Sequence, residues 1–166
     1  VWMKALDDAP RDLSLRQQIV ALLLEEGRTQ EAIESYAVIA SEGDPAERAA
    51  ALKELGRLHE FIDDFDNAVA VYREALGLVH YKHFLHDEFL TRLVRVHERF
   101  GRIDELEAEW LKPAEQENPT EESLMRMVKF YELTADSQKQ EQWLALLVER
   151  SISSTGWQQE LVELYI

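Results

Sequence analysis

Three histidines at positions 80, 83 and 86 are followed directly by two acidic residues, a pattern that could bind a metal ion. Imidazole and carboxylate groups suit zinc and similar divalent ions. Spacings of three and six residues, however, do not keep the rings of His80, His83 and His86 on one helix face. The alternative is a long loop with exposed histidines, under which Tyr81 and Phe84 pack. We therefore predict no bound metal or cofactor, with these histidines as the metal candidate.

A second set of residues is basic, falls at helical spacings and could bind carboxylates. The set comprises Lys53, Arg57, Arg92, Arg95, Arg99, Arg126 and Lys129. Arginine binds a carboxylate through two parallel hydrogen bonds, so this set would suit an acidic partner. The alternative is local neutralisation by acids one turn away, which contributes little to stability. The pairs would be Arg57–Glu60, Arg95–Glu98, Lys129–Glu132, Glu88–Arg92 and Glu122–Arg126.

The sequence contains no recognisable catalytic motif, and we predict that the protein is not an enzyme. It has no Gly-rich phosphate loop, no paired-histidine zinc motif and no nucleophile elbow. It also has no cysteine, which excludes disulfides, thiolate metal sites and cysteine nucleophiles. The hydroxyl residues at 151–155 are typical of a turn.

Composition limits the partners. The 166 residues carry 18 basic and 33 acidic side chains, a net charge of −15. Nucleic-acid binding needs a dense basic surface, so we expect a protein or peptide partner and no nucleic acid. No apolar stretch approaches the roughly 18–20 residues that span a bilayer, so we expect no membrane insertion.

The chain repeats. Turn-like pairs begin at Gly27, Asp63, Gly101 and Ala135, at spacings of 36, 38 and 34 residues. Apolar residues at i, i+3, i+4 and i+7 precede and follow each turn, as on the buried faces of amphipathic helices. Around the first turn these core positions include Val20 and Tyr36. Glycine adopts the left-handed backbone of a helix end at little cost. We expect the turns at Asp63 and Ala135, which lack glycine, to close differently.

One unit carries a known motif. It contains Leu52, Leu55 and Gly56, followed by Ala68 and Tyr72, and it resembles the tetratricopeptide repeat. Small residues at 56 and 68 indicate that the two helices of the unit cross closely. The resemblance is looser elsewhere. His59 and His97 stand at a tyrosine position, and Leu106 and Gln140 stand at the small alanine position. We expect both histidines to be packing residues, and Tyr72 and Trp110 to be buried.

The resemblance implies an all-α, right-handed superhelix (a solenoid) of antiparallel helix-turn-helix repeats, forming one array over residues 1–166. The expected parts are a half-repeat at 1–10, repeats at 11–44, 45–82, 83–118 and 119–156, and the start of a further helix at 157–166. Terminal repeats normally carry caps, so we expect the chain to be a piece of a longer array.

The resemblance also implies that the first helix of each repeat lines a concave groove. In the first two repeats this places the following side chains in the groove: Ser14, Gln17, Gln18, Ala21, Leu24, Glu25, Ala50, Lys53, Glu54, Arg57, Glu60 and Phe61. Arg57, Arg95 and Lys129 would form a basic ladder along it. The predicted binding residues are Lys53, Arg57, Phe61, Arg92, Arg95, Arg99, Met125, Arg126 and Lys129.

The function expected from this pattern is a non-enzymatic scaffold that binds a peptide or partner segment in the groove, with an acidic segment as the candidate. The alternative is a regulatory domain that senses a ligand or signalling peptide and controls an attached effector domain.

Overall fold

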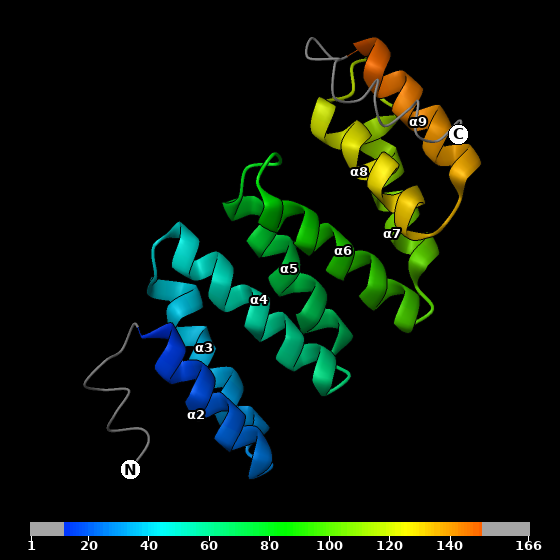
Figure 1. The fold of residues 1–166 in the computed structure, drawn as a ribbon. Coiled ribbons are helices and arrows are strands. Elements are labelled where there is room, and N and C mark those ends of the chain that lie inside the picture. Colours follow the sequence, from blue (N-terminus) through cyan, green and yellow to red (C-terminus); the bar gives the residue numbers. More distant parts are fainter. Residues whose placement is uncertain (1–11, 151–166) are drawn as a thin grey trace. The chain divides into compact units, whose positions relative to one another are not determined.

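The computed structural model describes residues 12–150, which contain eight α-helices and, within this range, no β-strand (Figure 1). The chain divides into two compact units, Val1–Phe89 and Leu90–Ile166. The all-α fold of antiparallel helix pairs is confirmed, and the right-handed superhelix stays a prediction. The expected half-repeat at 1–10 and the further helix at 157–166 lie outside the described residues. None of the described helices combines the length and apolar character that a membrane span needs.

The first unit contains two helix pairs and the beginning of a third. Its helices are α2 (Leu13–Glu25), α3 (Thr29–Glu42), α4 (Pro45–Phe61), α5 (Phe65–Leu78) and the first turns of α6 (Phe84–Arg99). From α2 to α5, each helix packs against the next, so that α3 lies between α2 and α4. Figure 1 shows α2 beside α3 and α4 beside α5.

Side-chain caps explain where three of these helices begin. Asp12 accepts a hydrogen bond from a backbone N–H of the first turn of α2. Asp44 and Glu47 form a reciprocal capping box at the start of α4, with Pro45 in the first helical position. Asp64 caps α5. Such caps satisfy backbone N–H groups that have no partner within the helix, and each stabilises it by about 1 kcal/mol.

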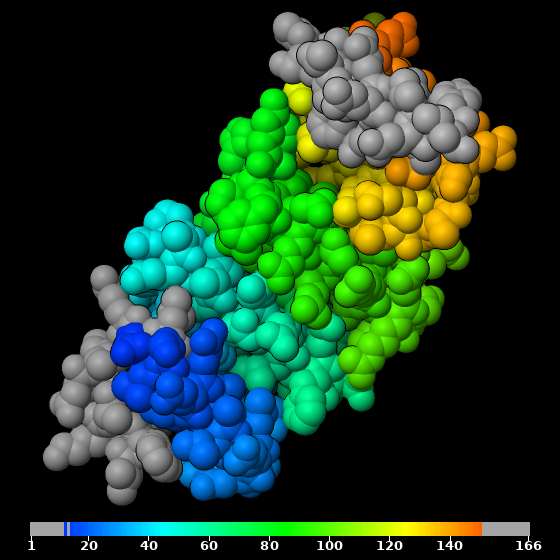
Figure 2. Space-filling model, viewed as in Figure 1, coloured from blue at the N-terminus to red at the C-terminus, as the bar shows by residue number. Residues whose placement is uncertain are grey.

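The core of the first unit is built from the apolar faces that the spacing predicts. Its fully buried side chains include Ile19 of α2, Tyr36 of α3, Leu52 of α4 and Tyr72 of α5. Ala68 is completely buried where α4 and α5 cross, as predicted for a small residue at that position. In the space-filling view, side chains close the space that the ribbons leave between α4 and α5 (Figure 2).

The second unit contains the remainder of α6, then α7 (Ile103–Ala114), α8 (Glu121–Leu133) and α9 (Ser137–Arg150). Within it, α7 packs on α8 and α8 packs on α9. Trp110 is 4% exposed, and its ring meets the edge of Phe130 at a centroid distance of 6.0 Å. The predicted burial of Tyr72 and Trp110 is therefore confirmed.

The four predicted turns share one conformation. Gly27, Asp63, Gly101 and Ala135 all have positive φ, at 73°, 57°, 67° and 59°. In each turn this residue donates its N–H to the carbonyl three residues earlier, and the next residue donates to the carbonyl five residues earlier. The expectation that Asp63 and Ala135 close differently is wrong, because the hydrogen bonds that end the preceding helix impose the same backbone on all four residues.

Candidate functional site

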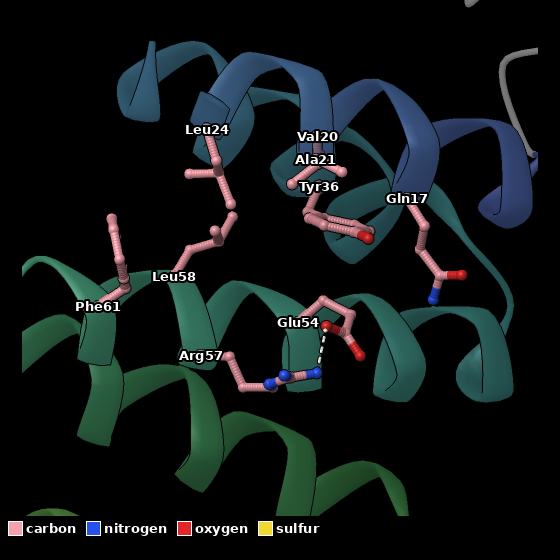
Figure 3. A pocket seen from close by; sticks show the side chains of 9 residues that line it. All are labelled: Gln17, Val20, Ala21, Leu24, Tyr36, Glu54, Arg57, Leu58 and Phe61. Carbon is pink, nitrogen blue, oxygen red and sulfur yellow. Dashed lines mark hydrogen bonds and ion pairs between the residues drawn. The ribbon is translucent and has the colours of Figure 1, made fainter. Parts of the chain in front are cut away.

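A pocket of about 370 Å³ opens in the first unit between α2, α3 and α4 (Figure 3). The first helices of the first two repeats, α2 and α4, form its two sides, and α3 contributes one residue between them. The lining residues are Gln17, Val20, Ala21, Leu24, Tyr36, Glu54, Arg57, Leu58 and Phe61. Six of these stand at positions where the sequence predicts a groove: Gln17, Ala21, Leu24, Glu54, Arg57 and Phe61.

The pocket has an apolar end and a polar end. Leu24, Leu58 and Phe61 gather at one end, while Gln17 and Glu54 stand at the other (Figure 3). Phe61 is 67% exposed although it is a large apolar side chain. Exposed apolar surface next to polar groups is typical of a binding site, because it gains from being covered while the polar groups fix the orientation of whatever covers it.

Tyr36 lies between the two ends. Its ring enters the pocket from α3 and lies between α2 and α4 (Figure 3), and the residue is 2% exposed. Burial, together with the nearby carboxylate of Glu54, raises the pKa of Tyr36 to about 12. The hydroxyl is therefore protonated at neutral pH and can donate a hydrogen bond. Within residues 12–150 the structure gives it no hydrogen-bond partner.

Arg57 provides the positive charge at the pocket. Its Nη1 lies 3.1 Å from Oε2 of Glu54, one turn earlier on α4. The predicted pair of Arg57 with Glu60 is wrong, since Glu60 instead accepts a hydrogen bond from the hydroxyl of Tyr72. The Arg57 side chain is 54% exposed, and a guanidinium has five N–H donors. Arg57 can thus bind a second carboxylate without leaving Glu54.

The helix pair that carries Arg57 has a recognisable family. Residues 51–82, which include most of α4 and all of α5, match the family model of the tetratricopeptide repeat. This helix pair thus matches one tetratricopeptide repeat. A comparison of the sequence with curated proteins finds no match. One solved structure with a similar fold is described as "Podosopora anserina putative kinesin light chain nearly identical TPR-like repeats". It is 19% identical to this chain with a TM-score of 0.49, and the similarity covers 94% of this chain and 86% of that one.

Within the tetratricopeptide repeat, the other predicted binding residue is Lys53. It lies on α4 one turn before Arg57, and its Nζ is 3.6 Å from Oε1 of Glu88 at the start of α6. Glu88, which the sequence pairs with Arg92, thus contacts a different helix. Of these three predicted binding residues on α4, Arg57 and Phe61 line the pocket and Lys53 does not.

The remaining predicted residues lie after the tetratricopeptide repeat, on α6 and α8. Arg126 pairs with Glu122, and Nζ of Lys129 lies 3.2 Å from Oε2 of Glu132, so both of these expected local pairs form. Arg92 and Met125 are half-buried, Arg95 and Arg99 are exposed, and the guanidinium of Arg99 lies 5.6 Å from the ring centroid of Phe100.

Arg95 differs from the other members of the predicted ladder. It is exposed, and in the part of the chain that the structure describes it makes no ion pair. The expected pair of Arg95 with Glu98 is therefore wrong. The ladder of Arg57, Arg95 and Lys129 along one groove stays a prediction.

Sequence reasoning assigned Tyr36 and Val20 to the core and did not single out Leu58, yet all three line the pocket. One signal could have identified Tyr36. The tetratricopeptide repeat places Glu60 twelve residues before Tyr72, and the equivalent position before Tyr36 is Leu24. An apolar residue there leaves the hydroxyl of Tyr36 without an internal acceptor.

The three histidines at positions 80, 83 and 86 differ in exposure. His80 and His83 are exposed, whereas His86 lies inside α6 and is 3% exposed. The loop alternative is wrong in two respects, because His86 is buried in a helix and Phe84 is 74% exposed rather than packed beneath. No group of three potential metal ligands occurs among the described residues.

The two histidines at the tyrosine position of the tetratricopeptide repeat pattern are packing residues, as predicted. Nδ1 of His59 lies 3.1 Å from Oδ2 of Asp64 across the turn between α4 and α5. His97 is 2% exposed, and its Nδ1 lies 2.6 Å from the carbonyl oxygen of Leu93. In both residues a ring nitrogen thus makes a polar contact with another residue of the same helix pair.

Proposed function

We propose that the protein is a non-enzymatic interaction scaffold that binds a peptide segment of a partner in a groove lined by the first helices of its repeats. The observation that carries this proposal is the pocket between α2 and α4. Six of its nine lining residues stand at positions predicted to face such a groove. Tetratricopeptide repeats commonly use this surface for binding extended or helical segments.

An acidic partner is favoured by the state of two guanidinium groups. Arg57 is exposed at the pocket with most of its N–H donors uncommitted, and Arg95 is exposed without an ion pair among the described residues. Lys129 and Arg126 already have carboxylate partners, so their contribution should be smaller. Charged contacts at an accessible surface mainly set specificity and association rate.

The proposal is tested with peptides selected for binding from a displayed random library. We expect the selected peptides to be enriched in Asp and Glu and to bind more weakly as salt rises, because exposed charges are screened. The double variant Arg57→Glu/Arg95→Glu should lose this binding while its circular dichroism stays helical. Peptides that bind this variant normally at low and high salt would contradict an acidic partner.

A matched control changes the same number of charges elsewhere. Arg28 and Arg102 stand at the beginnings of α3 and α7, away from the predicted groove positions. The double variant Arg28→Glu/Arg102→Glu should bind the selected peptides nearly as well as the unchanged protein. An equal loss in both double variants would mean that net charge alone, and not the positions of the changed arginines, governs binding.

A ligand-sensing regulatory domain is the second candidate, and the pocket volume favours it. Pockets of about 300–1,000 Å³ commonly hold small molecules, and this one measures about 370 Å³. Selection that yields no binding peptide, together with a small molecule that raises the thermal midpoint, would favour this candidate over the scaffold.

A further inference from the structure

The first unit contains two tyrosines at equivalent places, and their hydroxyls have different surroundings. Tyr36 of α3 and Tyr72 of α5 are both at most 2% exposed. The hydroxyl of Tyr72 donates to Glu60 of α4, twelve residues earlier. The hydroxyl of Tyr36 opens to the pocket and, within residues 12–150, has no hydrogen-bond partner. The oxygen of Tyr36 is not among the buried side-chain atoms that lack a partner, so it is accessible in the pocket. Its O–H can therefore donate a hydrogen bond to an acceptor that enters there.

One substitution between the repeats accounts for this difference, and a second changes what packs against the tyrosine ring. Leu24 stands where the next repeat has Glu60, so no carboxylate reaches Tyr36 from the preceding helix. Val20 stands where the next repeat has Gly56, which packs directly against the ring of Tyr72. Both Leu24 and Val20 line the pocket. In the second repeat the Glu60 carboxylate thus binds the Tyr72 hydroxyl, whereas in the first repeat Leu24 offers no polar atom to the Tyr36 hydroxyl.

We propose that this pocket binds a partner segment that presents a large apolar side chain next to an oxygen acceptor, with the acceptor placed on the Tyr36 hydroxyl. The inference deepens the proposed function and rests on it. Leu24, Leu58 and Phe61 cover the apolar side chain, and exposed Phe61 is buried by it. The partner's oxygen takes the place that the Glu60 carboxylate holds against Tyr72 in the next repeat.

The other polar groups of the pocket agree with an acceptor rather than a cation. Glu54, the acid of the lining, already binds Arg57 at 3.1 Å. The remaining N–H donors of Arg57 and the amide of Gln17 can assist the Tyr36 hydroxyl in binding a carboxylate. An ammonium group in the same place would meet Arg57, and like charges repel.

Small probes test this chemistry directly. The acid 4-methylpentanoate combines a branched apolar chain with a carboxylate, and 4-methylpentylamine has the same chain with an ammonium group. Binding is followed by NMR chemical shifts of the protein amides. We expect the acid to shift amides of α2 and α4 around the pocket, and the amine to do so at least several-fold more weakly. Equal binding of both probes, or no binding of the acid, would overturn the proposal.

Variants then locate the hydrogen bond. Tyr36→Phe removes only the hydroxyl and should weaken binding of the acid by roughly five- to tenfold while the unfolding midpoint stays unchanged. Tyr72→Phe is the matched control, and it should lower the midpoint and leave probe binding intact. Leu24→Glu supplies the internal acceptor that the next repeat has and should abolish probe binding. Unchanged affinity of Tyr36→Phe would overturn the proposal.

The two proposals fail in different ways. Probe binding that depends on Tyr36, combined with selected peptides that ignore Arg57 and Arg95, would leave the pocket assigned and refute the acidic groove. Peptide binding that depends on Arg57 and Arg95, combined with no effect of Tyr36→Phe on the acid, would support the groove and refute the pocket.

Discussion

Gly56 of α4 packs directly against the ring of Tyr72 of α5. A Cβ atom added to Gly56 would lie 2.9 Å from Cδ1 of that ring, and closer still to Cε1 and Cζ. Side chains essentially never approach this closely, so either the ring or α4 would have to move. The contact explains why the smallest residue stands in the middle of a helix, where glycine otherwise costs about 0.5–1 kcal/mol relative to alanine.

Replacing Gly56 by alanine should therefore destabilise the protein although alanine favours helices. Overpacking a close contact typically costs about 1–3 kcal/mol, and chemical denaturation should show a lower midpoint. Gly77 is the control, because it lies in α5 with no atom within 4 Å of an added Cβ and without positive φ. Gly77→Ala should leave the midpoint unchanged or raise it slightly. A higher midpoint for both variants would show that the ring of Tyr72 moves away from an added Cβ at no cost.

Ala135 offers the opposite change. It adopts φ 59° in the turn between α8 and α9, a conformation that costs residues with a Cβ roughly 1–2 kcal/mol. Ala135→Gly should raise the free energy of unfolding by about 0.5–1 kcal/mol, because glycine removes this strain but adds entropy to the unfolded chain. The reverse substitution at Gly101, whose φ is 67°, should lower it. Equal midpoints for Ala135→Gly and the unchanged protein would mean that the turn carries no strain.

Trp110→Ala should destabilise the second unit more than any surface change. The side chain is 4% exposed and its ring packs on the edge of Phe130. Truncating a buried aromatic residue typically costs about 3–5 kcal/mol. Hydrogen exchange should show faster exchange first in α7 and α8, since repeats depend mainly on their neighbours. Uniform exchange rates in the variant and the unchanged protein would contradict this packing role.

Glu107 should make stability depend on pH. The hydroxyl of Tyr131 donates to its Oε1 at 2.6 Å, and Nζ of Lys139 lies 3.0 Å away. The Tyr131 hydrogen bond, assisted by Lys139, lowers the pKa of Glu107. A carboxyl with a lower pKa in the folded state stabilises it fully above the unfolded pKa, about 4.3. This contribution is lost as pH falls through the folded pKa.

Glu107→Gln removes this titration. It should be less stable than the unchanged protein at about pH 7, and the difference should shrink as pH falls to about 3. Urea denaturation at both pH values measures it. Glu149→Gln is the control, because Glu149 is exposed and makes no ion pair among the described residues. A constant difference between the Glu107 variant and the unchanged protein at both pH values would contradict this account.

The repeat period and the apolar spacing suffice to predict the fold class, the turns and the buried faces. Gly56 and Ala68 could be assigned to a close helix crossing because both are small at positions where two helices meet. The backbone of Asp63 and Ala135 could not be predicted from their side chains, because the hydrogen bonds at the end of the preceding helix determine it.

The candidate site was predicted only in part. Arg57 and Phe61 face the pocket because their spacing puts them on the exposed face of α4. Tyr36 was assigned to the core, and it is buried, but burial alone does not show whether a hydroxyl has a partner. That depends on whether a residue of the neighbouring helix, twelve positions earlier, can reach it. The pair of Arg57 was mispredicted because acids stand one turn before it and one turn after it, and the structure pairs it with the earlier one, Glu54. Arg95 makes no ion pair in the described part of the chain.

Each of the four turns has one of two stabilising features: a glycine at the position of positive φ, or an aspartate that caps the next helix. Gly27 and Gly101 relax the backbone, but the N-cap residues of the helices that follow, Arg28 and Arg102, provide no side-chain cap. At the other two turns Asp64 and Asp136 cap the next helix, while the residue before each aspartate adopts positive φ without being glycine. None of these four turns combines glycine with aspartate. A Gly-Asp pair at every turn is thus an unused route to a more heat-resistant array, and it leaves the face that carries Tyr36 and Arg57 unaltered.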